Sequence, residues 1–176
     1  MGNDLNSSLL VRLRGNLSPA VLEQSCNEMI RRHEILRTVF STATDQPRQI
    51  VLPPLPLTVF YKNLLNLPAI DREAEAIRLG IEFAQPAFDL ASAPLIRVAL
   101  FQLAPEEHWL LVTMHHIISD GWSFGVFLQE LDALIQAFSR GIPAPLLDVP
   151  LQYADFAVWQ HQVYTEETIA RHLSLL

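Results

Sequence analysis

The chemistry of this chain is concentrated in one short segment, MHHIISDGWS, at residues 114–123. Two adjacent histidines, His115 and His116, follow an apolar run, and Asp120 with Gly121 precedes a stretch of helical periodicity. A strand end, a polar loop and a helix start are a common location for binding and catalytic residues. A capped strand-to-helix turn explains the aspartate and the glycine but not the paired histidines, so we interpret the segment as a functional site.

The two histidines should lie in different surroundings. Successive side chains of a strand point to opposite faces, so His115 and His116 cannot easily share one site. One ring should face the reacting groups while the other packs. A neutral imidazole, whose ordinary pKa is about 6.5, can accept a proton or a hydrogen bond at neutral pH.

A serine nucleophile is the first alternative. Residues 121–125, GWSFG, match the G-x-S-x-G elbow of α/β-hydrolases with Ser123 at the centre. The acid and histidine of a hydrolase triad could come from Asp148, Asp155, His161 and His172. The elbow should follow an apolar strand directly, however, and here residues 115–120 intervene, which argues against this hypothesis.

A metal site is the second alternative. His116 and Asp120 would share a helical face at a spacing of four residues. Gly121 and the preceding strand argue against a helix there, and the sequence offers no evident third ligand. We therefore expect no bound metal.

Composition indicates one globular domain. The chain has 176 residues, 50% of them hydrophobic, with 12 basic residues against 19 acidic ones and a net charge of -7, which disfavours nucleic acid. A single cysteine, Cys26, excludes a disulfide scaffold, favours a reducing cytoplasm and should be a small core residue. Without a membrane-length apolar run or a signal peptide, we expect a soluble, cytoplasmic protein.

Periodicity and turn residues predict the elements of the first half. The expected elements are a strand at 8–14, a helix from Ser18 to His33, a hairpin of strands at 36–41 and 49–52, a short edge strand at 57–61, and a helix capped by Asp71 and ended by Pro86.

The second half predicts an antiparallel pair beside the histidines. Strands at 95–103 and 108–115 flank a turn, and the second is apolar on both faces, which indicates a central strand. Helices are expected at 124–138, 151–162 and 166–176, with Trp159 in the core. The irregular alternation of strands and helices favours an α/β sandwich with a mixed sheet.

Three motifs resemble those of one family. HHIISDG at 115–121 resembles the HHxxxDG signature of the condensation domains of nonribosomal peptide synthetases. RHEILRTVF at 32–40 resembles the family's RHExLRTxF motif, and YADFAVWQ at 153–160 resembles YxDYAVWQ. Related acyltransferases and epimerization domains share HHxxxDG, but all three motifs in this order favour a condensation domain.

The resemblance implies a fold and an extent. Family members have two lobes, each similar to chloramphenicol acetyltransferase, with the active site in a tunnel between them. Residues 1–176 correspond to the N-terminal lobe, without the family's opening helix and C-terminal lobe. We therefore expect a two-layer α/β sandwich with a mixed sheet, weak or no activity in isolation, and self-association through the exposed lobe interface.

The resemblance also implies the reaction. An amine on one carrier-protein-bound aminoacyl group attacks a thioester on another, and a peptide bond forms. The donor and acceptor carrier proteins are then the partners, phosphopantetheine holds the substrates, and no cofactor binds directly. An epimerization domain, an ester-forming acyltransferase and a non-catalytic carrier-protein docking lobe are the alternatives.

By the same resemblance, His116 is the general base or positioning group and His115 a structural support. The Gly121 amide is expected near the thioester oxygen, with Trp122 and Ser123 lining the substrate site or capping the helix. Asp120 either caps that helix or forms a buried ion pair with an arginine. Resemblance favours the ion pair, and the candidate partners are Arg32, Arg37 and Arg97.

Overall fold

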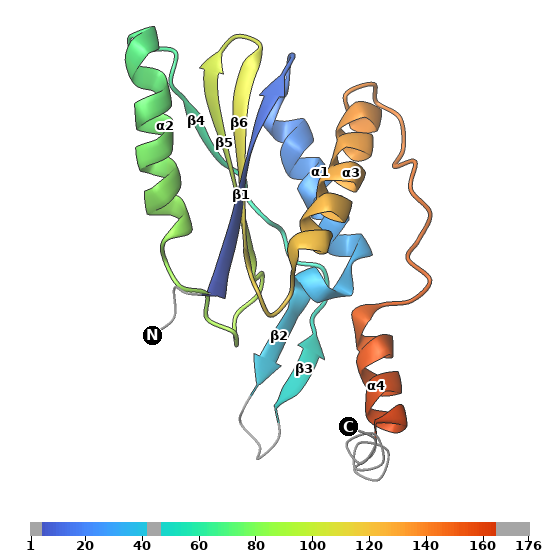
Figure 1. Ribbon diagram of the computed structural model, residues 1–176. Helices are drawn as coiled ribbons and strands as arrows, with labels where there is room; N and C mark the ends of the chain where they lie inside the picture. The colour runs from blue at the N-terminus through green and yellow to red at the C-terminus, as the bar shows by residue number, and fades with distance from the viewer. Residues whose placement is uncertain (1–4, 42–46, 165–176) are drawn as a thin grey trace, which may run out of the picture.

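A mixed four-stranded sheet forms the centre of the molecule, seen in the computed structural model in Figure 1, which describes residues 5–41 and 47–164. The strand order is β1-β6-β5-β4, namely β1 (Asn6–Arg14), β6 (Glu107–His115), β5 (Ile96–Ala104) and β4 (Phe60–Asn63). Both neighbours of β6 are antiparallel to it, while β4 pairs in parallel with β5. The predicted antiparallel pair and the central position of β6 are confirmed.

Helices cover both faces of this sheet (Figure 1). Helices α1 (Pro19–Arg32) and α3 (Gly121–Phe138) pack side by side on one face, and α2 (Ala69–Ala84) lies on the other. The α/β sandwich with a mixed sheet is thus confirmed, with helical cover on two faces where a single helical layer was expected.

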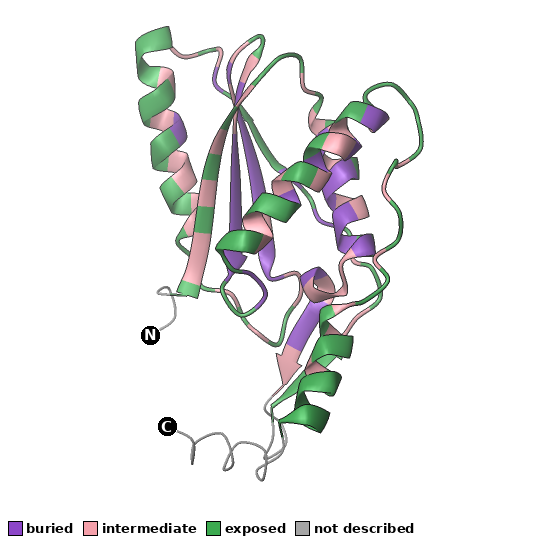
Figure 2. Cartoon of the chain, turned by 45° about the vertical axis from the view of Figure 1, so that its right-hand side comes forward, coloured by how far each residue is buried: buried purple, intermediate pink, exposed green. Residues whose placement is uncertain are grey.

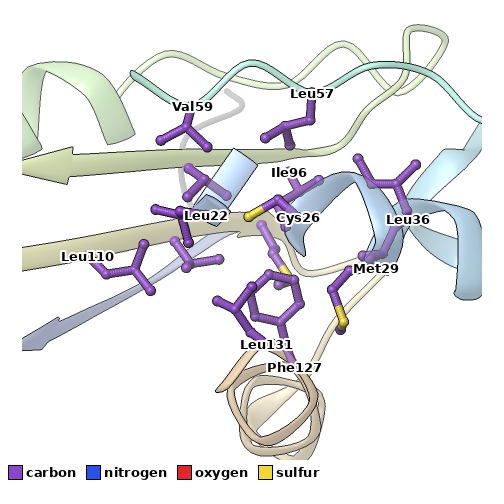
Figure 3. Close-up of a cluster of buried hydrophobic side chains, with 14 of the residues drawn as sticks. Leu22, Cys26, Met29, Leu36, Leu57, Val59, Ile96, Leu110, Phe127 and Leu131 are labelled. Atoms are coloured by element: carbon purple, nitrogen blue, oxygen red, sulfur yellow. The ribbon is translucent and has the colours of Figure 1, made fainter. Parts of the chain in front are cut away.

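Alternation along β6 divides the apolar interior into two clusters. Leu110, Val112 and Met114 enter the larger cluster under α1 and α3, whereas Leu111 enters the smaller one under α2. Cys26 is only 2% exposed within the larger cluster (Figure 3), which confirms its predicted core position. Burial raises the pKa of its thiol to about 12, so the sulfur stays protonated.

A separate hairpin extends from the end of α1. A short 3₁₀ turn, η2 (Glu34–Arg37), leads into β2 (Thr38–Ser41), which pairs antiparallel with β3 (Arg48–Val51). The predicted hairpin is confirmed, and the centre of its loop, residues 42–46, lies outside the described residues. The edge strand begins at Phe60, later than expected, because the preceding residues Leu57 and Val59 are drawn into the larger cluster (Figure 3).

Two further predictions are wrong, and a third concerns residues outside the described part of the chain. The Asp71 cap is wrong: Pro68 is the N-cap of α2, and Asp71 lies in the first turn. Trp159 is 51% exposed, so its core position is also wrong, because α4 (Tyr153–Val163) lies at the periphery and buries none of its residues (Figure 2). The helix expected at 166–176 falls outside the described residues. None of the helices in the described part of the chain is long and apolar enough to cross a membrane.

Candidate active site

His115 is the last residue of β6 and is buried, at 5% exposure. Its Nδ1 accepts the Ile117 backbone N–H at 3.0 Å, and its ring meets Phe88 edge to face at a centroid separation of 6.4 Å. Burial lowers the pKa of His115, and the neighbouring His116 lowers it further. The ring is therefore a neutral, packed group whose Nδ1 is already used.

His116 lies one residue further on and is exposed. Its backbone N–H donates to the Leu5 carbonyl at 2.7 Å, so the main chain is still held beside β1 where the loop begins. The two histidines thus lie in different surroundings, in agreement with the expectation from strand geometry. Of the two rings, His116 is the one exposed to solvent.

Asp120 caps α3. Its Oδ1 accepts the Ser123 backbone N–H at 2.8 Å and the Ser123 hydroxyl at 2.7 Å, and the Ser123 Oγ accepts the Asp120 N–H at 3.2 Å. These reciprocal bonds form a capping box, and the hydrogen bonds from Ser123 lower the pKa of the exposed Asp120 carboxyl. Helix amides therefore satisfy this carboxylate.

The predicted ion pair between Asp120 and an arginine is absent from the described residues, so that expectation was wrong. The guanidinium of Arg32 is bound to Glu130, that of Arg37 to Glu34 and the Leu52 carbonyl, and that of Arg97 to the carbonyls of Pro86 and Ala87. The physical reason is that Asp120 is exposed at a helix N-terminus, where backbone donors stabilise a carboxylate without a cation.

Arg32 and His33, the first two residues of the RHExLRTxF motif (called the RHE motif below), instead contact Glu130, which projects from α3. Nε of Arg32 lies 3.3 Å and Nε2 of His33 lies 2.7 Å from the Glu130 Oε2. Arg32 is 5% exposed, and its Nη1 also donates to the carbonyls of Leu146 at 3.2 Å and Leu147 at 2.7 Å. Burial alone would raise the pKa of Glu130, but the hydrogen bonds from His33 and Arg32 outweigh it and lower that pKa.

Gln152 joins the RHE motif to the third motif. Its Nε2 donates to the Arg32 carbonyl at 2.9 Å, and its Oε1 accepts the Glu34 N–H at 3.0 Å. Gln152 is also the N-cap of α4, where its N–H donates to Asp155 at 2.8 Å. Glu130 and Gln152 therefore connect the three motif regions.

Neither Glu130 nor Gln152 was identified from the sequence. The sequence does contain a signal for Glu130. This acidic residue lies three positions after Phe127 and four before Leu134, so it falls within the apolar stripe of α3. We find no comparable signal for Gln152.

A cavity of about 190 Å³ opens between the end of α1 and the start of α3. Its walls include Met29, Leu36, Met114 and Ile118. Trp122 and Ser123, the two residues expected to line a substrate site, also line this cavity. The HHxxxDG loop therefore borders a mostly apolar space on its inner side.

Gly121 is the first residue of α3. A Cβ built on it meets no atom within 4 Å, and positive φ angles among the described residues occur at Gly15 and Gly141 instead. Packing within this chain therefore imposes no need for glycine at position 121. Its amide belongs to the helix N-terminus, where main-chain N–H groups are available to an anionic oxygen.

The two alternative chemistries find little support in the geometry. Ser123 is the third residue of α3, and its hydroxyl donates to Asp120 at 2.7 Å. His116 precedes the helix, so it does not share a helical face with Asp120. Across residues 5–41 and 47–164, no three histidine, cysteine or acidic side chains are grouped closely enough to hold a metal ion. His172 lies outside the described residues.

Comparisons with known proteins agree on one family. The model of the "Condensation domain" family matches residues 2–174. Chondramide synthase cmdD of Chondromyces crocatus is 40% identical over 169 residues, which cover 96% of this chain and 4% of the synthase. Phosphinothricin tripeptide synthetase PhsC of Streptomyces viridochromogenes is 37% identical over 168 residues, which cover 96% of this chain and 16% of the synthetase.

Solved structures share the fold. The X-domain in its complex with OxyB from teicoplanin biosynthesis superposes with a TM-score of 0.78 at 32% identity, covering 90% of this chain and 33% of that one. The starter condensation domain of rhizomide synthetase RzmA gives a TM-score of 0.82 at 22% identity, over 93% of this chain and 40% of that one. This chain thus spans a small part of much longer proteins, and its match to the family model over nearly its whole length shows that it belongs to the condensation-domain family.

Proposed function

We propose that this chain is the histidine-bearing, N-terminal lobe of a two-lobed condensation domain that forms amide bonds. The donor thioester and the acceptor amine are carried on the phosphopantetheine arms of two carrier proteins in the cytoplasm. The observation that carries this proposal is the position of His116, an exposed imidazole on the loop between the central strand and the start of α3.

In the proposed reaction, the acceptor nitrogen forms a bond to the thioester carbonyl carbon and the C–S bond breaks. The nitrogen loses a proton and the departing sulfur gains one. A thioester is already activated, so the chief requirements are alignment of two tethered groups and management of this proton. His116 accepts the proton or holds the amine by a hydrogen bond.

The residues around His116 have supporting roles. The Gly121 amide, at the N-terminus of α3, is available to the developing oxyanion. Asp120 fixes the first turn of that helix through the capping box, and buried His115 anchors the end of β6. In this proposal, the position of the main chain around His116 and Gly121 is fixed by the helix cap and by the end of β6, and no ion pair at Asp120 is needed.

One lobe supplies one wall of the proposed tunnel. Large apolar side chains are exposed on and beside α4, including Leu151 at 76% and Trp159 at 51%. Exposed apolar groups of this size favour burial against a partner surface. We propose that the second lobe completes the site, and that the chain alone is nearly inactive and prone to self-association.

The test is a condensation assay with two loaded carrier proteins. The two-lobed domain and the 176-residue chain are compared, and the acceptor carrier is analysed by mass spectrometry. We expect an amide product from the domain and little or none from the chain. An ester product or an epimerised donor would instead assign a related reaction, and the absence of any product from the two-lobed domain would contradict the proposal.

A further inference from the structure

We infer that the cavity between α1 and α3 binds an apolar side chain of one carrier-bound substrate, of the size found in leucine or phenylalanine. This inference rests on the proposed function, because it names the substrate class that the same site would favour. It assigns a selective role to residues outside the three motifs, chiefly Met29 and Val126.

The size of the cavity matches a single apolar side chain. Its volume is about 190 Å³, and a dry apolar cavity of about 150 Å³ is known to hold benzene. The walls come from Met29 and Leu36 on the α1–η2 side and from Phe127 on α3. Figure 3 shows all three side chains within the buried apolar cluster. Because most of the lining is apolar, a charged group would lose hydration and gain few polar partners there.

The cavity lies beside the proposed reaction site. Met114 and Ile118, which flank the two histidines in sequence, both line it. Ser123, the capping partner of Asp120, lines it as well, and Trp122, at 83% exposure, marks its open side. A side chain held there would place its backbone next to the loop that presents His116.

Polar contacts between the end of α1 and α3 fix the distance between the two walls of the cavity. His33 lines the cavity from the end of α1, and its Nε2 is 2.7 Å from the Glu130 Oε2 on α3. Arg32 adds a second bond to the same oxygen at 3.3 Å. These contacts fix α1 against α3, so the cavity is formed before a substrate arrives, which lowers the ordering cost of binding.

Val126 offers a direct way to fill the cavity. It lines the space and is 37% exposed, so a larger side chain fits there without disrupting the buried cluster. Val126→Phe is the test variant. Gln129→Phe adds an exposed aromatic ring on the same helix, outside the cavity lining, and is the matched control.

The first experiment measures binding to the 176-residue chain with benzene as the probe. Methyl NMR signals of Met29 and Met114, which both line the cavity, are followed during the titration. We expect saturable shifts in the unchanged chain and in Gln129→Phe, and their loss in Val126→Phe. Saturable shifts that persist in Val126→Phe, or no saturable shift in the unchanged chain, would overturn the inference.

The second experiment measures selectivity in the two-lobed domain. Carrier-bound substrates with alanine, leucine, phenylalanine or aspartate side chains are varied at the donor and then at the acceptor. We expect Val126→Phe to lower kcat/KM for leucine and phenylalanine at least about tenfold relative to alanine on one of the two sides, with Gln129→Phe unchanged.

The outcomes separate the two proposals. An unaltered preference in Val126→Phe, together with normal amide formation, would overturn the cavity inference and leave the proposed function in place. No amide product from any substrate with the unchanged domain would contradict the proposed function, and the benzene titration would still decide whether the cavity binds apolar groups.

Discussion

Nε2 of His33 lies 2.7 Å from Oε2 of Glu130 and joins the RHE motif to the helix that begins at the HHxxxDG motif. The same oxygen is 3.3 Å from Nε of the buried Arg32. One carboxylate therefore balances a buried guanidinium and fixes α1 against α3. Arg32 was expected to form an ion pair with Asp120, but it pairs with Glu130 in the middle of α3 instead.

Removing Glu130 should cost much stability. Glu130→Ala leaves the Arg32 charge without its counter-charge, at 5% exposure, and we expect a loss of about 3 kcal/mol in the free energy of unfolding. Glu28→Ala is the control, because Glu28 pairs with the half-exposed Arg31 on α1, and such pairs contribute at most about 1 kcal/mol. Urea unfolding of the three proteins measures both losses, and equal values would contradict the assigned role of Glu130.

Substitutions at Asp120 should follow the rules for helix caps. Asn caps as well as Asp does, so Asp120→Asn should keep the melting temperature nearly unchanged, while Asp120→Ala should lower it by a few degrees. Circular dichroism melts give both values. If Asp120→Asn proved as damaging as Asp120→Ala, hydrogen-bond capping alone would not explain the role of Asp120, and the carboxylate charge itself would be required at the start of α3.

Two buried histidines should make stability dependent on pH. Burial lowers the pKa of both His108 and His115, so below about pH 6.5 each binds fewer protons in the folded chain than in the unfolded chain. Their contribution is present above that pH and is lost as the pH falls towards 5, at up to about 1.4 kcal/mol per pH unit for each group.

Urea unfolding between pH 7 and pH 5 measures this slope. His115→Asn, which can keep an acceptor for the Ile117 N–H, should reduce the slope. A slope that is unaffected in His115→Asn would show that folding does not lower the pKa of this ring.

Cys26 should be unreactive in the folded chain. Its 2% exposure and raised pKa keep the thiol protonated and out of reach. We expect iodoacetamide to leave the thiol unmodified at neutral pH. In urea at about 8 M, which unfolds the chain, the same reagent should alkylate the thiol fully. Rapid alkylation without denaturant would mean that α1 separates readily from the sheet.

The parts of the fold that follow local periodicity could be predicted from the sequence. The alternation in β5, the apolar run of β6 and the apolar stripe of α3 were sufficient, because burial follows the period of two in a strand with one solvent-facing side and of about 3.6 in a helix. The different surroundings of His115 and His116 followed from the same rule.

The contacts that join distant segments could not be predicted in this way. Glu130 is 97 residues from His33, and Gln152 is 118 from Glu34, so no local period links them. The partner of Asp120 was misjudged because a buried ion pair was assumed where an exposed cap forms. Trp159 was misjudged because apolar residues at helical spacing do not reveal which surface will cover them.

The most direct test of the central claim is the amide yield of the two-lobed domain carrying His116→Ala, measured with two loaded carrier proteins. Because His116 is exposed, we expect the variant to fold and melt like the unchanged domain while its rate of amide formation falls by about 100-fold or more. An undiminished rate from a folded His116→Ala variant would contradict the assignment of His116 to the reaction.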